Sequence, residues 1–328
     1  MNRRTLISSA FVAASLALAT TASAQTNWTM ASGYPESSFF TQNIREMIKE
    51  IEEKTNGELK IDLRSNDSLI KLDAVKRAVQ SGQVQIGEIR LGVYSNEAAM
   101  YNLDNIPGVA TDYDQAAKLL DAQKPFFADL FASNGMRVIS YAPWPGQGFY
   151  TKAPVTSLDD LKGKKLRIYS RPTQVMGEDL GMEALILPFA EVPQAFATGM
   201  IDALWTSAQT GTDVQVWDYA KYFTYTGTMH NKNAIIVSER AFRQLDEATQ
   251  QIVLEAGENA TQRAFEMSKA AGAEREGVLV EHGVTIAQAP QDILDRIEAI
   301  GGEMVQEWLA SASEAEAAVY ETYRASLN

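Results

Sequence analysis

The segment A-V-Q-S-G-Q-V-Q-I-G-E, residues 78–88, aligns with A-F-A-T-G-M-I-D-A-L-W, residues 195–205, at a constant offset of 117 positions. Each segment has the pattern of a helix that ends at a glycine and is followed by a strand. Glycine suits this place because a left-handed helix C-cap favours a residue without a Cβ. Two generic helix–glycine–strand units could also match by chance. A duplication is the simpler interpretation, and it predicts two similar lobes.

A second pair of segments supports this duplication. Leu59–Ile61 and Leu166–Ile168 both follow shortly after a glycine and precede the repeated unit. Around them, short apolar strands alternate with helical patterns, which is typical of parallel α/β sheets. We therefore expect an α/β chain with two facing lobes.

The organisation of the chain follows from this pattern. We assign residues 25–147 and 233–272 to lobe I, and residues 148–232 and 273–328 to lobe II. An Ala-rich helical pattern within 248–277 predicts one long helix that spans both lobes. Hinges are expected near Gln147 and Lys232, where the chain crosses between lobes. The helices within 290–327 are expected to pack on lobe II.

The N-terminus has the features of a cleavable secretory signal. Residues 1–24 combine the basic pair Arg3-Arg4, an Ala/Leu-rich run and an A-x-A site at 22–24. Cleavage near Ala24–Gln25 would place the mature protein in the periplasm. No later run approaches ~20 apolar residues, so we expect no stable membrane insertion after cleavage. The pattern leaves open whether export uses the general secretory or the twin-arginine route.

Composition argues against several classes of function. A formal net charge of −13 disfavours binding of nucleic acid or anionic lipid by bulk attraction. The chain has no cysteine, and its two histidines, His230 and His282, lack metal-ligand spacing. It contains no G-x-S-x-G, P-loop or G-x-G-x-x-G motif. We therefore expect a binding protein, with no metal, cofactor or catalytic residue, that acts as a monomer.

One short stretch concentrates positive charge. D-L-K-G-K-K-L-R-I-Y-S-R, residues 160–171, carries five cations, and Arg167 alternates with apolar Leu166 and Ile168 as in a strand. A guanidinium in a core strand is costly unless a carboxylate meets it, and its planar shape suits bidentate pairing. The partner is either an internal acid or the carboxylate of a ligand.

Several runs carry a family resemblance. They are S-L-D-D-L-K-G-K-K-L-R-I-Y (157–169), L-G-M-E-A-L-I-L-P-F-A-E-V-P-Q-A-F-A-T-G-M-I-D-A (180–203), N-G-E-L-K-I (56–61), S-G-Q-V-Q-I-G-E-I (81–89) and N-A-I-I-V-S (233–238). Together they resemble the DctP-type substrate-binding proteins of tripartite ATP-independent periplasmic (TRAP) transporters. The resemblance implies a two-lobed periplasmic-binding-protein (Venus-flytrap) fold. It also implies capture of an organic carboxylate by domain closure and its delivery to a sodium-coupled TRAP membrane permease.

The resemblance implies that Arg167 pairs with the ligand carboxylate. Two departures bear on the ligand. Gly148-Phe149-Tyr150 stands where many members have G-F-R, and Trp205-Thr206-Ser207 stands in place of an Asn-containing run. The missing cation favours a ligand with one carboxylate, although Arg90 or Arg171 could compensate. The identity of the acid is left open.

Other candidate contacts follow from topology, because ligands in open parallel sheets bind beyond the carboxyl ends of the strands. This rule brings together residues that follow strands or lie at the lobe crossings. The predicted ligand-binding residues are Arg167, Trp205, Glu88, Arg90, Tyr34, Ser38, Gln147, Tyr150, Arg171, Ser207, Asn231 and Asn233. Two alternatives to the transport hypothesis are a receptor that presents an organic acid to a sensor kinase and, less favoured, an organic-acid lyase or hydrolase.

Overall fold

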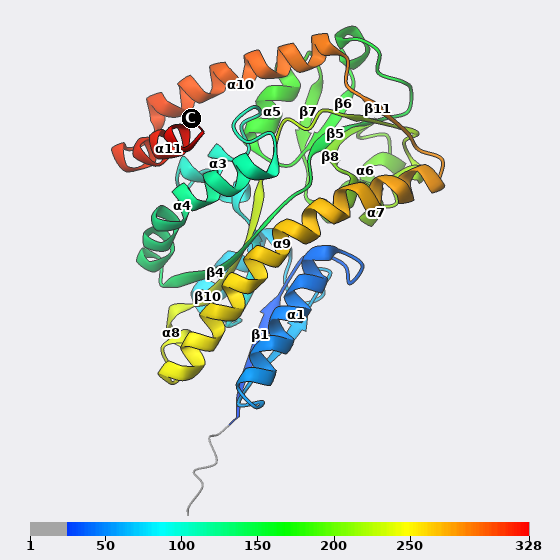
Figure 1. The fold of residues 1–328 in the computed structure, drawn as a ribbon. Coiled ribbons are helices and arrows are strands. Elements are labelled where there is room, and N and C mark those ends of the chain that lie inside the picture. The colour runs from blue at the N-terminus through cyan, green and yellow to red at the C-terminus, as the bar shows by residue number, and fades with distance from the viewer. Residues whose placement is uncertain (1–24, 328) are drawn as a thin grey trace, which may run out of the picture.

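Two β-sheets, one in each lobe, organise the chain in the computed structural model, which describes residues 25–327 (Figure 1). The expected signal segment, 1–24, lies outside the described residues. Within the described part of the chain, no helix combines the length and the apolarity needed to cross a membrane.

Lobe I contains a five-stranded sheet in the order β2-β1-β3-β10-β4. Its strands are β1 (Thr26–Ala31), β2 (Leu59–Arg64), β3 (Ile86–Arg90), β4 (Met136–Pro143) and β10 (Lys232–Ser238). Strand β1 pairs in parallel with β2 and β3, whereas β10 runs antiparallel to both β3 and β4. The helices of this part of the chain are α1 (Phe39–Lys54), α2 (Val75–Ser81), α3 (Met100–Leu103), α4 (Tyr113–Ser133) and α8 (Glu239–Phe242).

Lobe II contains a six-stranded sheet in the order β11-β9-β5-β8-β6-β7. Its strands are β5 (Gln147–Thr151), β6 (Lys165–Ile168), β7 (Glu183–Ile186), β8 (Ala203–Ser207), β9 (Tyr222–Tyr225) and β11 (Thr285–Gln288). Three short helices accompany them: α5 (Arg171–Asp179), α6 (Val192–Ala197) and α7 (Ala208–Asp213).

The repeated helix–glycine–strand unit is present in both lobes. Helix α2 ends at Gly82, whose φ of 77° is left-handed, and β3 follows. In lobe II, α6 is followed by Gly199, with φ 70°, and by β8. Each of these strands lies between a parallel neighbour and an antiparallel strand that arrives from the other lobe. The two lobes therefore share one arrangement.

One pair of equivalent segments was assigned wrongly from the sequence. The order β2-β1-β3-β10 corresponds to β7-β6-β8-β5, so β6 is the counterpart of β1. The sequence pattern instead pairs Leu166–Ile168, in β6, with Leu59–Ile61, in β2. Both β1 and β2 are short alternating strands, and local pattern does not state which strand takes the inner place in a sheet.

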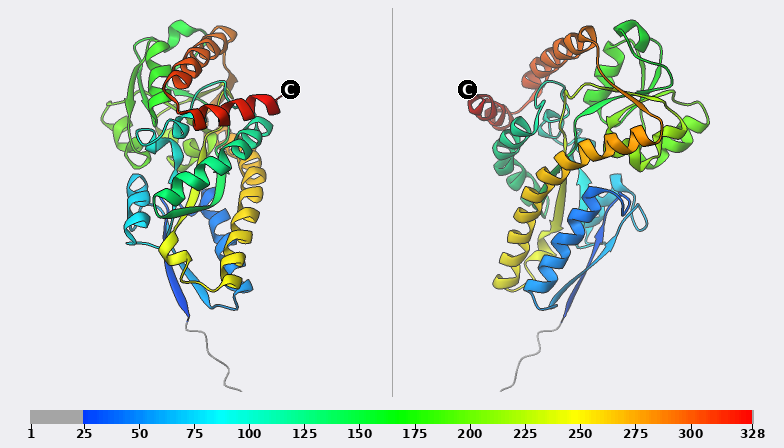
Figure 2. Two further views of the ribbon diagram at one scale, coloured as in Figure 1. Left: turned by 90° about the vertical axis from the view of Figure 1, so that its left-hand side faces the viewer. Right: turned by 45° about the vertical axis from the view of Figure 1, so that its right-hand side comes forward.

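The chain crosses between the lobes three times. Residues 144–146 connect β4 to β5, and residues 226–231 connect β9 to β10. The third crossing is α9 (Glu247–Glu281), which packs on α1 and β4 in lobe I and on α7 and β11 in lobe II. At 1.5 Å per residue this helix is about 50 Å long, and Figure 2 shows it running along both lobes. The expected long helix spanning both lobes is confirmed.

The C-terminal helices differ from expectation. Helix α10 (Gln291–Ser311) packs on α5 of lobe II, but α11 (Glu314–Ser326) turns back onto α4, as both views in Figure 2 show. Two hydrogen bonds explain this return: Trp308 Nε1 donates to the Ala99 carbonyl at 2.7 Å, and Glu316 accepts from the Met100 amide at 2.8 Å. The C-terminus therefore contacts both parts of the fold.

Candidate ligand-binding site

A cavity lies where the two sheets face each other. It is lined by Tyr34, Arg90, Trp144, Gln147, Arg167, Tyr169, Phe189, Thr206, Thr210 and Asn231. These residues come from strand ends, from loops that follow strands, from helix α7 and from the two loop crossings between the sheets. Topology alone predicts a site at this place, beyond the carboxyl ends of parallel strands.

Arg167 is the most unusual member of the cavity wall. Strand β6 carries it between β7 and β8, and only 1% of its surface is exposed. Its Nε donates to the Leu187 carbonyl at 3.0 Å, while its Nη2 is buried without a hydrogen-bond partner. Among the described residues, no Asp or Glu lies within ion-pair distance of its guanidinium, so the internal-acid alternative is not supported.

The charge of Arg167 is poorly compensated. Burial, followed by the nearby positive charge of Arg90, lowers the pKa of Arg167 to about 9. A guanidinium is ordinarily charged at any accessible pH, so this shift reports how strongly the site disfavours an uncompensated cation. An anionic group that entered the cavity would remove much of that penalty.

Arg90 brings a second guanidinium to the cavity from the end of β3. Its Nη2 lies 3.7 Å from the Asp73 carboxylate, a partly exposed partner, and its Nε is buried without a hydrogen bond. The guanidinium lies over the Tyr169 ring, 5.2 Å from the centroid. Arg90 therefore supplies the cation that is missing at Tyr150, but from the opposite lobe.

Aromatic rings enclose the remaining space. Tyr34 follows β1 and contacts Trp144 edge-on at 5.3 Å and Phe189 edge-on at 5.7 Å between ring centroids. Phe189 follows β7, so this contact bridges the two lobes. The Tyr34 hydroxyl is buried near Asn233 without a hydrogen bond of normal geometry, and burial raises its pKa well above the ordinary value. A neutral O–H donor is therefore available in the cavity beside the two cations.

Two predicted residues, Glu88 and Asn233, lie behind the cavity wall and are linked to it by hydrogen bonds. Trp144 Nε1 donates to Asn233 Oδ1 at 2.9 Å, and Asn233 Nδ2 donates to Glu88 Oε1 at 2.9 Å. Ser32 donates to the other Glu88 oxygen at 2.5 Å, and burial raises the pKa of Glu88 to about 7. Glu88 and Asn233 therefore hold Trp144 in place and do not line the cavity.

The structure places four other predicted residues outside the cavity wall. Trp205 packs edge-on against Phe149 at 4.6 Å in a hydrophobic core. Tyr150 stacks on Phe223 at 4.4 Å, and its hydroxyl donates to the Ser207 carbonyl. The Ser207 side chain accepts from the Thr210 amide and caps α7. Ser38 is a buried residue at the start of α1, and its side chain makes no capping hydrogen bond.

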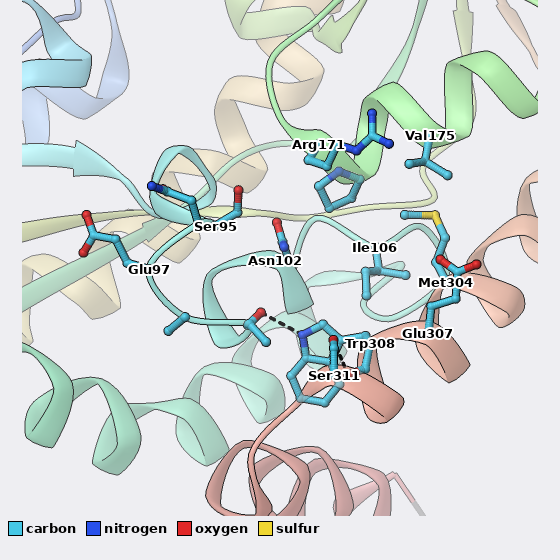
Figure 3. Close-up of a pocket in the computed structure, with 14 residues that line it drawn as sticks. Ser95, Glu97, Asn102, Ile106, Arg171, Val175, Met304, Glu307, Trp308 and Ser311 are labelled. Carbon is cyan, nitrogen blue, oxygen red and sulfur yellow. Dashed lines mark hydrogen bonds between the residues drawn. The ribbon is translucent and has the colours of Figure 1, made fainter.

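Arg171 lies in a different cavity, shown in Figure 3. It begins α5 and hydrogen-bonds Gln174 at its exposed surface. The cavity around it is larger, about 1060 Å³, but its arginine is exposed to water and already paired with a neutral amide. Because no buried cation without a partner lines it, the smaller cavity is the better candidate site.

Sequence reasoning missed part of the wall. Tyr34, Arg90, Gln147, Arg167 and Asn231 were predicted and line the cavity, whereas Tyr169, Phe189, Thr206 and Thr210 were not selected. The alternation of β6 offered one signal, since Tyr169 lies two positions after Arg167. Nothing local marked Phe189 or Thr210, which reach the cavity only because the lobes face each other.

Comparison with known proteins identifies the family. Residues 30–311 match the model of bacterial extracellular solute-binding protein, family 7, named DctP. The chain belongs to this family. Its members and structural neighbours are solute-binding receptors and not enzymes, and neither the sensor-kinase alternative nor the lyase or hydrolase alternative finds support among them.

Three relatives illustrate the likeness. DctP7 of Bordetella pertussis, an extracytoplasmic solute receptor binding pyroglutamic acid, is 36% identical with a TM-score of 0.88, covering 91% of this chain and 99% of its own. A marine metagenome TRAP solute-binding protein specific for pyroglutamate is 29% identical with a TM-score of 0.88, covering 92% and 99%. A Sulfitobacter solute-binding protein is 29% identical, covering 78% of each chain. This DctP-family chain is therefore a TRAP-type solute receptor.

Proposed function

We propose that this receptor captures a small organic monocarboxylate of the pyroglutamate type and delivers it to a TRAP membrane permease. The observation that carries the proposal is Arg167, a buried guanidinium without an acidic partner among the described residues, on the wall of a small cavity. The similar structures that bind pyroglutamic acid support the size and class of the ligand.

The second cation does not require a second carboxylate. Arg90 is partly neutralised by Asp73 at 3.7 Å, whereas Arg167 has no such partner. One carboxylate between the two guanidiniums would offset the uncompensated charge. A dicarboxylate would place a second anion in a site where Arg90 already faces the Asp73 carboxylate and where aromatic rings line the wall, and we expect the site to disfavour it.

Calorimetric titration tests this proposal directly. The purified mature protein is titrated with L-pyroglutamate, with L-proline, which matches the ring but adds a charged amine, and with succinate as a dicarboxylate. We expect stoichiometric binding of pyroglutamate, at least tenfold weaker binding of the other two acids, and no turnover. Preference for succinate, or the absence of any acid binding, would overturn the ligand assignment.

Closure of the lobes would complete the capture step. We assign residues 25–147 and 233–272 to lobe I and residues 148–232 and 273–328 to lobe II, with bending at the crossings near Gln147 and Lys232. The edge contact between Tyr34 and Phe189 joins the lobes beside the ligand. Comparison of small-angle scattering with and without pyroglutamate tests whether the ligand reduces the radius of gyration.

Export completes the proposal. Residues 1–24 act as a signal that is cleaved near Ala24–Gln25, which releases the receptor into the periplasm. Membership of an extracellular solute-binding family supports this location. Mass spectrometry of the protein recovered from a periplasmic extract should give a chain that starts at or next to Gln25. A full-length chain in that extract would contradict cleavage.

A further inference from the structure

A buried ion pair lies next to the ligand cavity without lining it. Lys232, the first residue of β10, is fully buried, and its Nζ lies 3.2 Å from Oδ2 of Asp104, which is 2% exposed. Burial raises the pKa of the Asp104 carboxyl, and the Lys232 ammonium opposes that rise. Buried ion pairs often contribute little net stability. A role other than stabilising the fold is therefore considered for Asp104 and Lys232.

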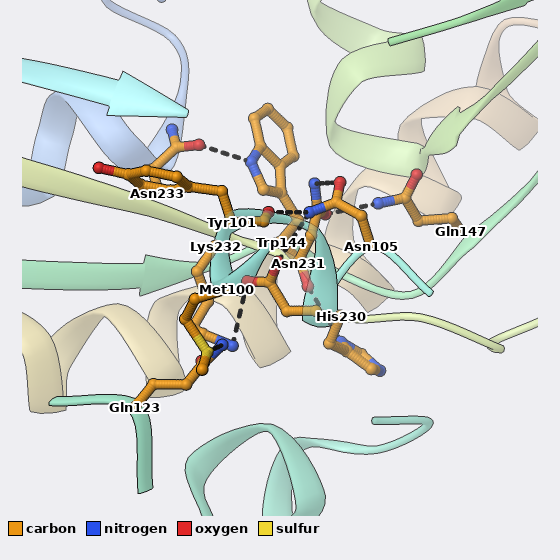
Figure 4. A network of polar contacts seen from close by, with 11 residues as sticks. Met100, Tyr101, Asn105, Gln123, Trp144, Gln147, His230, Asn231, Lys232 and Asn233 are labelled. Carbon is orange, nitrogen blue, oxygen red and sulfur yellow. Dashed lines mark hydrogen bonds and ion pairs between the residues drawn. The ribbon is translucent and has the colours of Figure 1, made fainter. Parts of the chain in front are cut away.

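Amide side chains connect this pair to the cavity, as Figure 4 shows. Asn105 Nδ2 donates to Asp104 Oδ1 at 2.7 Å, and Asn231 Nδ2 donates to Asn105 Oδ1 at 3.4 Å. Asn105 and Asn231 are both fully buried, at 0% and 1% exposure. The first of these amides lies behind the wall and the second is part of it.

The chain of contacts continues along the cavity wall. Gln147 Nε2 donates to Asn231 Oδ1 at 2.8 Å, and the Tyr169 hydroxyl donates to Gln147 Oε1 at 2.6 Å. All three residues line the cavity. We call Asn105, Asn231 and Gln147 the amide chain. It joins the two loop crossings between the lobes, since Gln147 begins β5 and Asn231 precedes β10.

The direction of these hydrogen bonds is set at one end. A primary amide has a donor end and an acceptor end, whereas a carboxylate only accepts and an ammonium only donates. Asn105 Nδ2 donates to Asp104 Oδ1 at 2.7 Å and, more weakly, to the Tyr101 carbonyl at 3.4 Å, so Asp104 is the stronger of two acceptors that turn the NH₂ group of Asn105 toward the ion pair. Each following amide must then turn the same way, because an O···O or N···N contact would leave buried polar atoms unpaired.

We propose that Asp104 and Lys232 are positioning residues that fix the hydrogen-bond direction of the cavity wall. In this direction, one hydrogen of Gln147 Nε2 is engaged with Asn231 and the other is left as a donor for the ligand. The Tyr169 hydroxyl hydrogen is committed to Gln147. This inference rests on the proposed function for its consequence in binding, because a donor at Gln147 favours an anionic ligand.

The Asp104→Asn substitution should reverse the chain. The new amide would turn its oxygen to Lys232 and its NH₂ group to Asn105, which would then have to present its own oxygen. The side-chain amides of Asn231 and then Gln147 would have to reverse their orientation in the same way. Gln147 would then direct an acceptor at the ligand carboxylate, so we expect binding of pyroglutamate to weaken at least tenfold.

Exchanging the side chains of residues 104 and 105 should restore ligand binding. In the double variant Asp104→Asn with Asn105→Asp, the carboxylate moves to position 105. There it accepts one hydrogen bond from the amide at position 104 and one from Asn231. The direction from Asn231 to Gln147 is then the native one. We expect the double variant to bind pyroglutamate within about threefold of the wild-type protein. A role in stability alone gives no reason for this recovery.

Two measurements make the test decisive. Affinity for L-pyroglutamate is measured by calorimetry, and the side-chain NH₂ resonances of Gln147 in the unliganded protein are recorded by ¹⁵N NMR, assigned by their loss in Gln147→Glu. We expect these resonances to shift in Asp104→Asn and to return in the double variant. Lys76→Met is the control, because it removes a buried lysine of lobe I that is ion-paired with the exposed Glu97, away from the cavity.

The outcomes separate the possible explanations. Wild-type affinity and unshifted resonances in Asp104→Asn would overturn the inference, as would a folded double variant that still binds weakly. An equal loss of affinity in Lys76→Met would assign the effect to general destabilisation and would also overturn it. If the wild-type protein does not bind pyroglutamate, the ligand proposal fails, and the Gln147 resonances still decide whether Asp104 sets the direction.

Discussion

Arg90 and Arg167 place their guanidinium groups over the same aromatic ring, that of Tyr169, at 5.2 and 5.5 Å from its centroid. Arg90 comes from the lobe I sheet, whereas Arg167 and Tyr169 come from lobe II. Two like charges that approach in a buried site disfavour each other. The arrangement therefore opposes closure of the empty receptor and favours closure around an anion.

Arg167→Met should separate binding from folding. The substitution keeps most of the side-chain volume and removes a buried cation that has no acidic partner. Loss of a charge-assisted contact in a buried site costs about 2–5 kcal/mol, so affinity for the carboxylate should fall by about 30-fold or more. The melting temperature of the ligand-free protein should stay the same or rise. Arg137→Met, which removes a partly exposed partner of Glu239, is the matched control and should keep its affinity.

Trp205→Phe and Trp144→Phe should show opposite behaviour. Trp205 lies in the hydrophobic core against Phe149, so its replacement should lower the melting temperature and leave affinity within about threefold. Trp144 lines the cavity and donates to Asn233, so its replacement should weaken binding more than it lowers the melting temperature. Thermal melts and titrations of both variants provide the comparison. A strong binding defect in Trp205→Phe alone would contradict this placement.

Glu88 should make the stability of the ligand-free protein fall as pH rises. Its pKa is about 7 in the folded protein and 4.5 as the ordinary value, so between these limits the folded state holds more protons than the unfolded state. The penalty is absent below about pH 4.5 and complete above about pH 7. At 1.36 kcal/mol per pKa unit, it amounts to about 3 kcal/mol.

Glu88→Gln tests this pH dependence. Denaturant unfolding of both proteins at pH 5 and pH 8 should show that the wild-type protein loses about 2–3 kcal/mol relative to the variant between the two values, because a small part of the penalty is already present at pH 5. Parallel changes in the two proteins would rule out Glu88 as the source. Asp213, whose pKa is also about 7 because of burial, contributes equally to both curves and does not affect their difference.

Arg275→Ala should increase the rate of ligand release. Arg275 lies on α9, donates to Gln209 of α7 at 3.3 Å, and reaches the Ser37 carbonyl of lobe I at 3.2 Å. It therefore bridges the lobes without lining the cavity. We expect a threefold to tenfold higher dissociation rate in stopped-flow fluorescence, with a nearly unchanged association rate. Lys124→Ala, which removes an exposed pair with Glu258, should change neither rate.

Local sequence signals predicted the elements of the fold well. The glycines at 82 and 199 mark helix ends in both lobes, and the two loop crossings end directly before the predicted positions Gln147 and Lys232. The strand order was harder, because β1 and β2 have similar alternating patterns and the choice of the inner strand depends on distant contacts. For the same reason, the return of α11 to α4 was not foreseen.

In the binding site, too, local signals identified some residues, whereas residues placed by distant contacts were missed. Arg167 stood out because a cation inside an apolar strand requires an explanation wherever the strand lies. Trp205 and Tyr150 lie on opposite faces of the second sheet, each in its own hydrophobic cluster, and the local sequence of β8 and β5 does not distinguish a residue packed in such a cluster from one that lines the cavity. Thr210 entered the wall through the packing of the two lobes, which leaves no local mark.

The position of β10 between β3 and β4 in the first sheet has a consequence for synthesis. This strand pairs with both β3 and β4, yet the chain makes all the core strands of the second sheet, β5 to β9, before reaching it. Most of the polypeptide must therefore leave the ribosome before the N-terminal half can complete its hydrogen-bonding ladder at residue 238. Neither lobe is a continuous segment of the chain, so a single truncation cannot produce an intact lobe. The two lobes must therefore fold together.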